Sequence, residues 1–294
     1  MKVKRADVAD IVKSGARLDA ERSQDVLIQV VVEVDAPEAV VEGLRERLRP
    51  ETARARLSIG VAGADETLVL DRAADALVVA GGSLGAETTR LLAQAREAFV
   101  PAVLLVVAPQ EQHAAVTDAT GHASADVLVD EDVERLLSKR LAGWLADEVP
   151  SKRMALARNF PFVRRSVAEA AVRATAWQNA LIGTVGFIPG ADMPVMTANQ
   201  IKMLLQIAAA YGEPLGTERI KELLAVVGGG FAFRTLARQA VGVVPVLGWA
   251  VKGGIGYSGT LAMGKAAIAY FEAGADLPSV ARRLRAASGS ASRG

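Results

Sequence analysis

Two long apolar stretches, residues 177–212 and 241–271, constrain the fold of this chain more than any other feature. Each contains only two charged side chains, so most of its surface must be covered by protein or by lipid. A transmembrane helix needs about 20 consecutive, mostly apolar residues. Lys202 interrupts the first stretch, and Lys252 and Lys265 interrupt the second. We therefore expect a water-soluble helical bundle, with contact to a membrane as the open alternative.

The second stretch carries small residues at every fourth position. This spacing places them on one ridge of a helix, where small side chains let another backbone approach closely. A glycine inside a helix costs about 1 kcal/mol relative to alanine, so we expect a compensating contact. The ridge residues predicted to make a packing or interaction contact, within a bundle or in a homo-oligomer, are Ala250, Gly254, Ser258, Ala262 and Ala266.

A turn with two prolines precedes the helix that we expect over residues 194–211. Asp192 can cap this helix, and Pro194 fits its first turn, where a missing N–H is harmless. Together with Pro189, these residues are predicted to form a packing or interaction site at the start of the helix.

Residues 152–182 are expected to form a long basic helix, for which Phe160-Pro161 is a candidate break. Apolar residues recur in it at helical spacing. Either it packs on a core and leaves its basic face in solvent, or it lies on an anionic membrane surface. The residues of the predicted basic surface are Arg158, Arg164, Arg165 and Arg173.

The first half of the chain alternates apolar runs of strand length with helical patterns. The clearest runs are residues 26–34, 76–80 and 102–108, and shorter ones are residues 56–61 and 127–129. Continuous apolar strands joined by helices predict an α/β domain with a doubly wound, mostly parallel sheet that is covered on both faces.

Ligands bind such sheets beyond the carboxyl ends of the strands. The turn after the first run contains Asp35 and Glu38 but no glycine, so it would repel a phosphate. The turn after residues 76–80 is rich in glycine and opens a helix, which makes Gly81, Gly82 and Gly85 the candidate residues for binding an anion.

No other motif predicts phosphate or metal chemistry. Residues 259–265 fit the pattern G-x-x-x-x-G-K, but Ala266 stands where a phosphate loop needs Ser or Thr, and no strand precedes them. His113 and His122 are expected in a loop, and their spacing fits no standard metal site. We therefore expect no nucleotide, no cofactor, no metal and no catalytic residue.

Charge is divided unevenly along the chain. Residues 151–294 carry 17 Lys and Arg against 7 Asp and Glu, whereas residues 1–150 carry 17 against 26. Either the two halves attract each other, or the basic half faces an anionic surface such as lipid. Aromatic residues do not alternate with the basic ones as base stacking requires, so nucleic acid is not an expected partner.

One further feature bears on location: the N-terminus has no apolar secretory segment. The chain also has no cysteine, which is compatible with any compartment. We expect a cytoplasmic protein, with peripheral binding to the inner membrane as the alternative.

The first half resembles a small GTPase domain that has lost its chemistry. The segment AADALVVAGG, followed by LLAQAREAFVPAVLLVVAPQE, is similar to the fourth strand, helix and fifth strand of that fold. Pro109-Gln110-Glu111 stands near the guanine-reading Asn-Lys-x-Asp of the family, and Ser124-Ala125 near its later Ser-Ala loop. The phosphate loop and Asn-Lys-x-Asp are missing, so the resemblance implies a domain that does not bind GTP in the usual way.

The second half resembles the bacterial domain of unknown function 697 family, a helical domain often found next to GTPase domains. The similarity covers about residues 165–275. Members of this family are regarded as membrane-associated or as companions of GTPases, and membership implies no activity. The matching residues are Pro189, Asp192, Pro194, Gln200, Met203, Tyr211, Gly212, Pro245, Gly248, Thr260, Gly264, Ala267, Tyr270 and Phe271.

These patterns predict an N-terminal arm or helix over residues 1–22, a GTPase-like α/β domain over 23–149, a helical domain over 150–278 and a disordered tail over 279–294. The function that we expect is that of a non-enzymatic interaction or scaffold protein. Its helical domain would dock on a protein partner, on a second copy or on the cytoplasmic membrane face. An atypical GTP or ATP hydrolase is the alternative.

Overall fold

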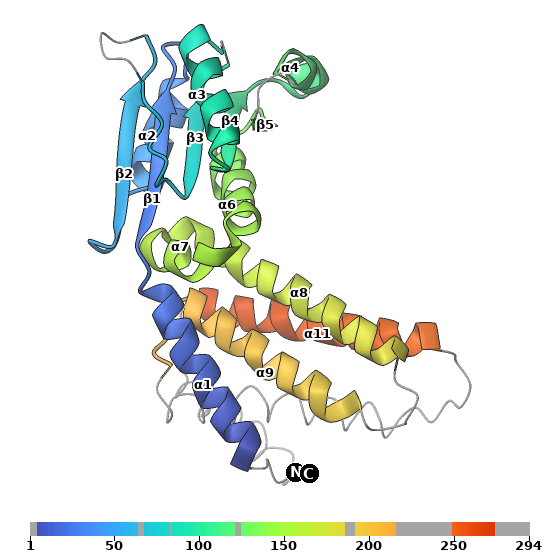
Figure 1. Ribbon diagram of the computed structural model, residues 1–294. Helices are drawn as coiled ribbons and strands as arrows, with labels where there is room; N and C mark the ends of the chain where they lie inside the picture. Colours follow the sequence, from blue (N-terminus) through green and yellow to red (C-terminus); the bar gives the residue numbers. More distant parts are fainter. Residues whose placement is uncertain are drawn as a thin grey trace. The chain divides into compact units, whose positions relative to one another are not determined.

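The computed structural model describes residues 5–63, 68–82, 84–120, 125–185, 192–215 and 249–273. It contains a five-stranded parallel sheet with helices, followed by a helical region, so the predicted fold class is confirmed (Figure 1). Contacts between Cα atoms divide the chain into two compact units. We call Glu21–Val167 the sheet unit, and Met1–Ala20 with Ala168–Gly294 the helical unit. The domain limits expected from the sequence stay predictions.

The sheet has the order β2-β1-β3-β4-β5, and every neighbouring pair is parallel. Valine and leucine dominate the three central strands because both faces of these strands are buried. The direction of winding reverses between β1 and β3, so their carboxyl ends flank the topological switch point of the sheet. The strands are β1 (Val26–Val32), β2 (Ala55–Val61), β3 (Ala76–Ala80), β4 (Ala102–Val107) and β5 (Asp126–Asp130).

Helices cover both faces of the sheet. On one face, Leu91 and Leu92 of α3 (Ala86–Glu97) pack in one core cluster with the sheet residues Leu77 and Leu104. On the other face lies α2 (Glu38–Arg47), where a Cβ added at Gly43 would lie 2.5 Å from Cδ1 of Leu137.

Leu137 belongs to the helical segment that closes the sheet unit. This segment consists of α5 (Val133–Arg135), the π-helical turn η2 (Leu136–Leu141) and α6 (Ala142–Glu148). The loop expected around His113 is wrong, because α4 (His113–Thr120) follows the short turn η1 (Gln110–Gln112).

The long basic helix expected over residues 152–182 is broken at the predicted place. The segment consists of η3 (Pro150–Lys152), α7 (Arg153–Asn159), η4 (Pro161–Val163) and α8 (Arg164–Val185). Phe160 is extended, with φ −129° and ψ 94°, because the ring of Pro161 excludes the helical conformation in the residue before it. Asn159 ties this break to the sheet unit, since its side-chain oxygen accepts a 2.6 Å hydrogen bond from the hydroxyl of Thr52.

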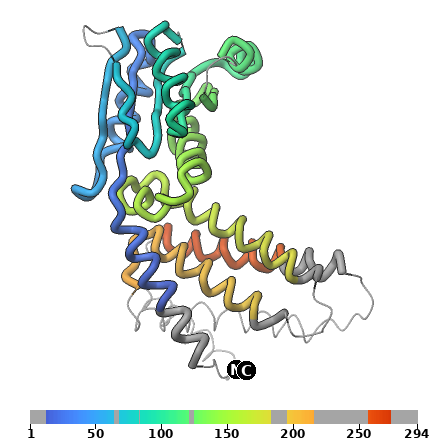
Figure 2. The backbone as a smooth tube through the Cα atoms, in the orientation of Figure 1, coloured from blue at the N-terminus to red at the C-terminus, as the bar shows by residue number. Residues whose placement is uncertain are grey.

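The helical unit contains most of α1 (Arg5–Arg22), most of α8, and all of α9 (Asp192–Ala210) and α11 (Trp249–Glu272). Figure 2 shows α8, α9 and α11 side by side, and their buried residues form one cluster around Val172, Met203 and Ile268. The helices meet closely at Gly264 of α11, where an added Cβ would lie 2.3 Å from Cγ2 of Val172. None of the described helices combines the length and the apolar character that crossing a bilayer requires.

Candidate functional site

The carboxyl ends of β1 and β3 form the place where a sheet of this order holds a ligand. Here the place is taken by Glu33, the residue after β1, which is 3% exposed. Its carboxylate accepts hydrogen bonds from the backbone N–H of Leu84, at 3.2 Å, and of Gly85, at 3.1 Å. Its own N–H donates to the carbonyl of Ala80, at 2.8 Å. A side-chain anion therefore occupies the donors that a bound phosphate would use.

The three glycines predicted to bind an anion lie in this turn. The backbone conformation and close packing of one of them, Gly81, account for a glycine at that position without any ligand. Gly81 has φ +141°, which other residues rarely adopt, and a Cβ added there would lie 2.7 Å from Oε2 of Glu33. Gly82 is exposed, and Gly85 stands at the amino end of α3 with open space around it. The structure thus brings the three glycines together, with Glu33 packed against the first.

The backbone of Leu84, in the same turn, is strained. Its φ of +44° is unfavourable for a residue with a side chain, at a cost of about 1 kcal/mol. The hydrogen bond from its N–H to Glu33 favours this conformation. The carboxylate also lies at the positive end of α3, which stabilises it electrostatically. Glu33, Leu84 and Gly85 thus form a closed cap on the helix.

A second group of polar residues lies at the carboxyl ends of β4 and β5. The side chain of Asp130 is 1% exposed and accepts hydrogen bonds from Nε of Arg135, at 2.8 Å, and Nε of Arg140, at 2.9 Å. These bonds, led by the one from Arg135, hold the pKa of the Asp130 carboxyl well below its usual range. Both guanidinium groups are therefore fixed in place by one buried carboxylate.

These arginines line a hollow of about 260 Å³ together with Gln110 and His113. The charge of the arginines is largely matched, because Asp130 contacts both and the carboxylate of Glu131 lies 3.9 Å from Arg135. An imidazole nitrogen of His113 lies 3.0 Å from the carbonyl oxygen of Ala108, which orients the ring. We interpret the ion pairs of Asp130 with Arg135 and Arg140 as structural contacts that hold the end of β5 against α5 and η2.

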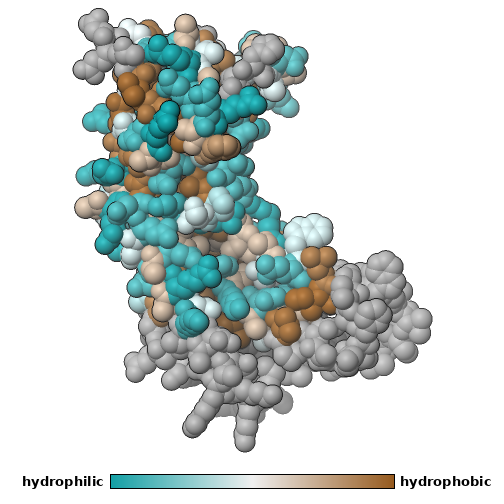
Figure 3. Space-filling view, viewed as in Figure 1, coloured by the Kyte–Doolittle hydropathy of each residue, from teal (hydrophilic) through white to brown (hydrophobic). Residues whose placement is uncertain are grey.

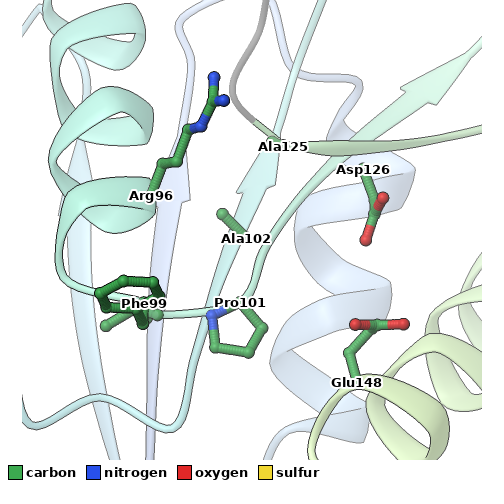
Figure 4. A pocket seen from close by; sticks show the side chains of 8 residues that line it. Arg96, Phe99, Pro101, Ala102, Ala125, Asp126 and Glu148 are labelled. Carbon is green, nitrogen blue, oxygen red and sulfur yellow. The ribbon is translucent and has the colours of Figure 1, made fainter.

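A larger hollow, of about 460 Å³, lies at the other end of the strands (Figure 4). Ala102 and Asp126, which line it, begin β4 and β5, so it lies at the amino ends of the strands. Asp126 accepts a 2.7 Å hydrogen bond from the indole of Trp144. Phe99 stands at its rim, 93% exposed and with φ +56°. Among the described residues, the charged groups that line this hollow are Arg96, Asp126 and Glu148.

The helical unit has a polar centre in an otherwise apolar interior. Asn179 of α8 and Thr260 of α11 are both 0% exposed. The Asn179 amide donates to the Thr260 hydroxyl at 3.0 Å and accepts from the Asn199 amide at 3.1 Å. Gln200 of α9 donates to the same hydroxyl at 3.2 Å. This polar network joins α8, α9 and α11. Because Thr260 takes part in it from inside a helix, residues 259–265 do not form a phosphate loop.

The small-residue ridge is exposed where its side chains are described. Ser258, Ala262 and Ala266 lie on the outer face of α11, and the close helix contact is made by Gly264 instead. Ala250 and Gly254 fall outside the residues whose side chains are described. The same is true of Asp192 and Pro194 at the start of α9, and Pro189 lies outside the described residues altogether. The interaction role of these residues stays a prediction.

The predicted basic residues fall into two groups. Arg164 donates to the carboxylate of Glu51 at 2.7 Å, and Arg158 lies 3.5 Å from the hydroxyl of Ser23, so both are engaged within the sheet unit. Arg165 and Arg173 are exposed, and only Arg173 belongs to the helical unit. The structure therefore does not bring the four together in one unit. In the part of the chain that is described, no group of three or more His, Asp or Glu residues could hold a metal ion.

These observations define a protein with an all-parallel α/β unit, whose switch point is closed by its own glutamate, and a helical unit with a polar centre. A family model described as Domain of unknown function (DUF697) matches residues 152–285, so this part of the chain belongs to that family. No curated protein and no solved structure matches the chain. The likeness of the first half to a GTPase is not confirmed and stays a prediction.

Four of the residues behind the family resemblance are buried among those whose side chains are described: Met203, Thr260, Gly264 and Ala267. The rings of Tyr211 and Phe271 stack at 5.7 Å. Two residues with central positions were not predicted from the sequence, Glu33 and Asn179. The available signal for Glu33 was a single polar residue in the apolar strand segment VVEV, and for Asn179 one of two neighbouring polar residues in the helix segment WQNALI.

Proposed function

We propose that this protein is a non-enzymatic interaction protein, in which the sheet unit handles no phosphate and the helical unit supplies a docking surface. The observation that carries the proposal is the Glu33 carboxylate, bound to the N–H groups of Leu84 and Gly85. A phosphate at this turn would have to displace a buried side chain and would meet its negative charge. Because this displacement and the charge repulsion oppose phosphate binding, they support a structural role for the sheet unit, as a scaffold.

The outer face of α8 supports the docking role of the helical unit. Arg173, Trp177 and Leu181 follow one another at intervals of four residues and are all exposed, with Trp177 and Leu181 each at 63%. Trp177 packs edge-on against Tyr257, with the ring centres 5.3 Å apart. Figure 3 shows hydrophobic side chains gathered on this part of the helical unit. Tryptophan and arginine are typical of protein contact sites and of membrane interfaces.

A thermal-shift titration with GTP, ATP and magnesium, and with phosphate alone, tests the first part. We expect the melting temperature of the wild type to stay constant in each case. A Glu33→Ala variant is the matched control, because it frees two N–H donors; phosphate is expected to stabilise the variant and not the wild type. A saturable rise for the wild type with nucleotide would instead favour the alternative, an atypical hydrolase.

Flotation with anionic liposomes at low and high salt tests the second part. If the docking surface contacts lipid, the wild type floats at low salt and a Trp177→Glu variant does not. Phe99→Glu is the matched control, since it removes a still more exposed aromatic residue from the sheet unit. Absence of binding at low salt removes the membrane form of the proposal and leaves a protein partner.

A further inference from the structure

The outer edge of β2 carries unpaired backbone groups. β2 is the first strand of the sheet and pairs with β1 along all seven residues, without a bulge (Figure 1). The carbonyl of Arg54 and the N–H of Ala62 bond toward β1, so even-numbered residues face β1 and odd-numbered residues face outward. Leu57, Ile59 and Val61 therefore direct their N–H and C=O groups away from the sheet. No described residue hydrogen-bonds to them.

The side chains of Leu57, Ile59 and Val61 are apolar; Leu57 is half-buried, and the other two are exposed. Ile59 is 68% exposed, Val61 48%, and Val34 beside them 82%. Figure 3 shows hydrophobic side chains gathered over this side of the sheet unit. Proteins usually protect an edge strand with lysine, proline, a bulge or shortness, because an open edge pairs with other strands. β2 has none of these, and Arg56 is its one charged residue.

The opposite edge of the same sheet is protected. β5 has five residues and both begins and ends with an aspartate, Asp126 and Asp130. Asp130 is held by two arginines, and Asp126 by the indole of Trp144. The two edges of one sheet thus differ, and the contrast indicates that β2 receives a strand.

We propose that β2 pairs with β2 of a second copy of this chain, antiparallel, about a two-fold axis at Ile59. Such a contact needs only one self-complementary surface. In this register Ile59 faces Ile59 of the second copy, and Leu57 faces Val61 of the second copy. Both pairs are hydrogen-bonded pairs, because all of these residues direct their backbone groups outward. The single charge, Arg56, faces Ala62 of the second copy and meets no like charge.

The self-complementarity of β2 explains why a second copy of this chain, and not another protein, is expected to pair with it. The outward backbone groups of Leu57, Ile59 and Val61 each have a partner of the right kind, and apolar side chains meet apolar side chains, without any further chain. One strand pair buries less surface than the roughly 800 Å² per partner of a standard interface, so a reversible dimer is expected. The inference concerns the sheet unit and does not rest on the docking surface of the helical unit.

Single cysteines test the register directly, because the chain has no cysteine of its own. In Ile59→Cys the two Cα atoms across the axis lie about 5.5 Å apart, within the range of about 4.4–6.8 Å that a disulfide spans. The matched control is Arg56→Cys, in the same exposed strand. Its Cα atoms are offset by six residues, about 20 Å along the strand. We expect a covalent dimer of Ile59→Cys under mild oxidation and none of Arg56→Cys.

Sedimentation velocity over roughly 1–200 µM tests the dimer without a cross-link. We expect the mass of the wild type to rise with concentration, and Ile59→Lys to weaken the dimer at least tenfold. Because Ile59 is exposed, circular dichroism is expected to show an unchanged fold. Phe99→Lys, an exposed substitution away from β2, is expected to dimerise like the wild type. A wild type that stays monomeric throughout, or equal cross-linking of the two cysteine variants, overturns the proposal.

Discussion

Two glycines of α11 offer the sharpest test of the packing in the helical unit. A Cβ added at Gly264 would lie 2.3, 2.5 and 2.9 Å from Cγ2, Cγ1 and Cβ of Val172, whereas nothing lies within 4 Å of a Cβ added at Gly259. Ordinary contacts between carbon atoms are about 3.5–4.0 Å. Rotating the Val172 side chain cannot relieve the clash, because its Cβ is itself too close. The helices would have to separate by about 1 Å.

The expected magnitudes follow from two opposing effects. Replacing a helical glycine by alanine gains about 1 kcal/mol of helix propensity at either position. Overpacking costs about 1–3 kcal/mol at Gly264 only. Gly259→Ala should therefore raise the free energy of unfolding by about 0.5–1 kcal/mol, and Gly264→Ala should lower it or leave it unchanged. Both variants gain the same helix propensity. The difference between their free energies of unfolding therefore equals the cost of overpacking at Gly264, about 1–3 kcal/mol.

Urea denaturation followed by far-UV circular dichroism and by tryptophan fluorescence measures both variants. The double variant Gly264→Ala with Val172→Ala adds a check, because it removes the two shortest contacts, at 2.3 and 2.5 Å, and should lower the cost of the alanine at 264, although the contact with Cβ at 2.9 Å stays. Equal stabilisation by Gly264→Ala and Gly259→Ala would contradict a close helix contact at Gly264. The same holds if the cost of Gly264→Ala does not change when Val172 is replaced by alanine.

Three further predictions concern single side chains. Glu33→Ala should lower the free energy of unfolding by about 1–3 kcal/mol, because two part-buried N–H groups lose a charged acceptor; urea denaturation measures it. The lowered pKa of Asp130 means that its carboxylate stabilises the protein above the unfolded value near 3.8 and loses this effect as the pH falls below it. Asp130→Asn should therefore flatten the acid limb of a stability-versus-pH curve. Asn179→Leu should cost about 1–3 kcal/mol by thermal denaturation, and exposed Gln178→Leu almost nothing.

Much of the fold was predictable because its signals are local. The runs at residues 26–34, 76–80 and 102–108 are apolar on both faces, which only a covered parallel strand explains. The break at Phe160 follows from the proline after it. The short helix α4 was missed because its eight residues contain only a weak apolar pattern and no capping side chain was recognised.

The candidate site was harder to predict because it depends on contacts between distant residues. Gly81, Gly82 and Gly85 were identified from a local motif, but the residue that fills their turn, Glu33, is about 50 residues away in the sequence. Only the pairing of β1 with β3 brings them together. The polar network of Asn179 with Thr260 likewise depends on how α8 meets α11.

That network also bears on how an alanine-rich bundle keeps a single arrangement. Small, similar side chains allow a helix to slide by one turn along its neighbours with little change in apolar burial. Such a slide would move the Thr260 hydroxyl by about 5.4 Å and leave the amides of Asn179 and Gln200 without it. The four polar side chains therefore set the axial alignment of three helices, in the way that a buried asparagine sets the alignment of a coiled coil.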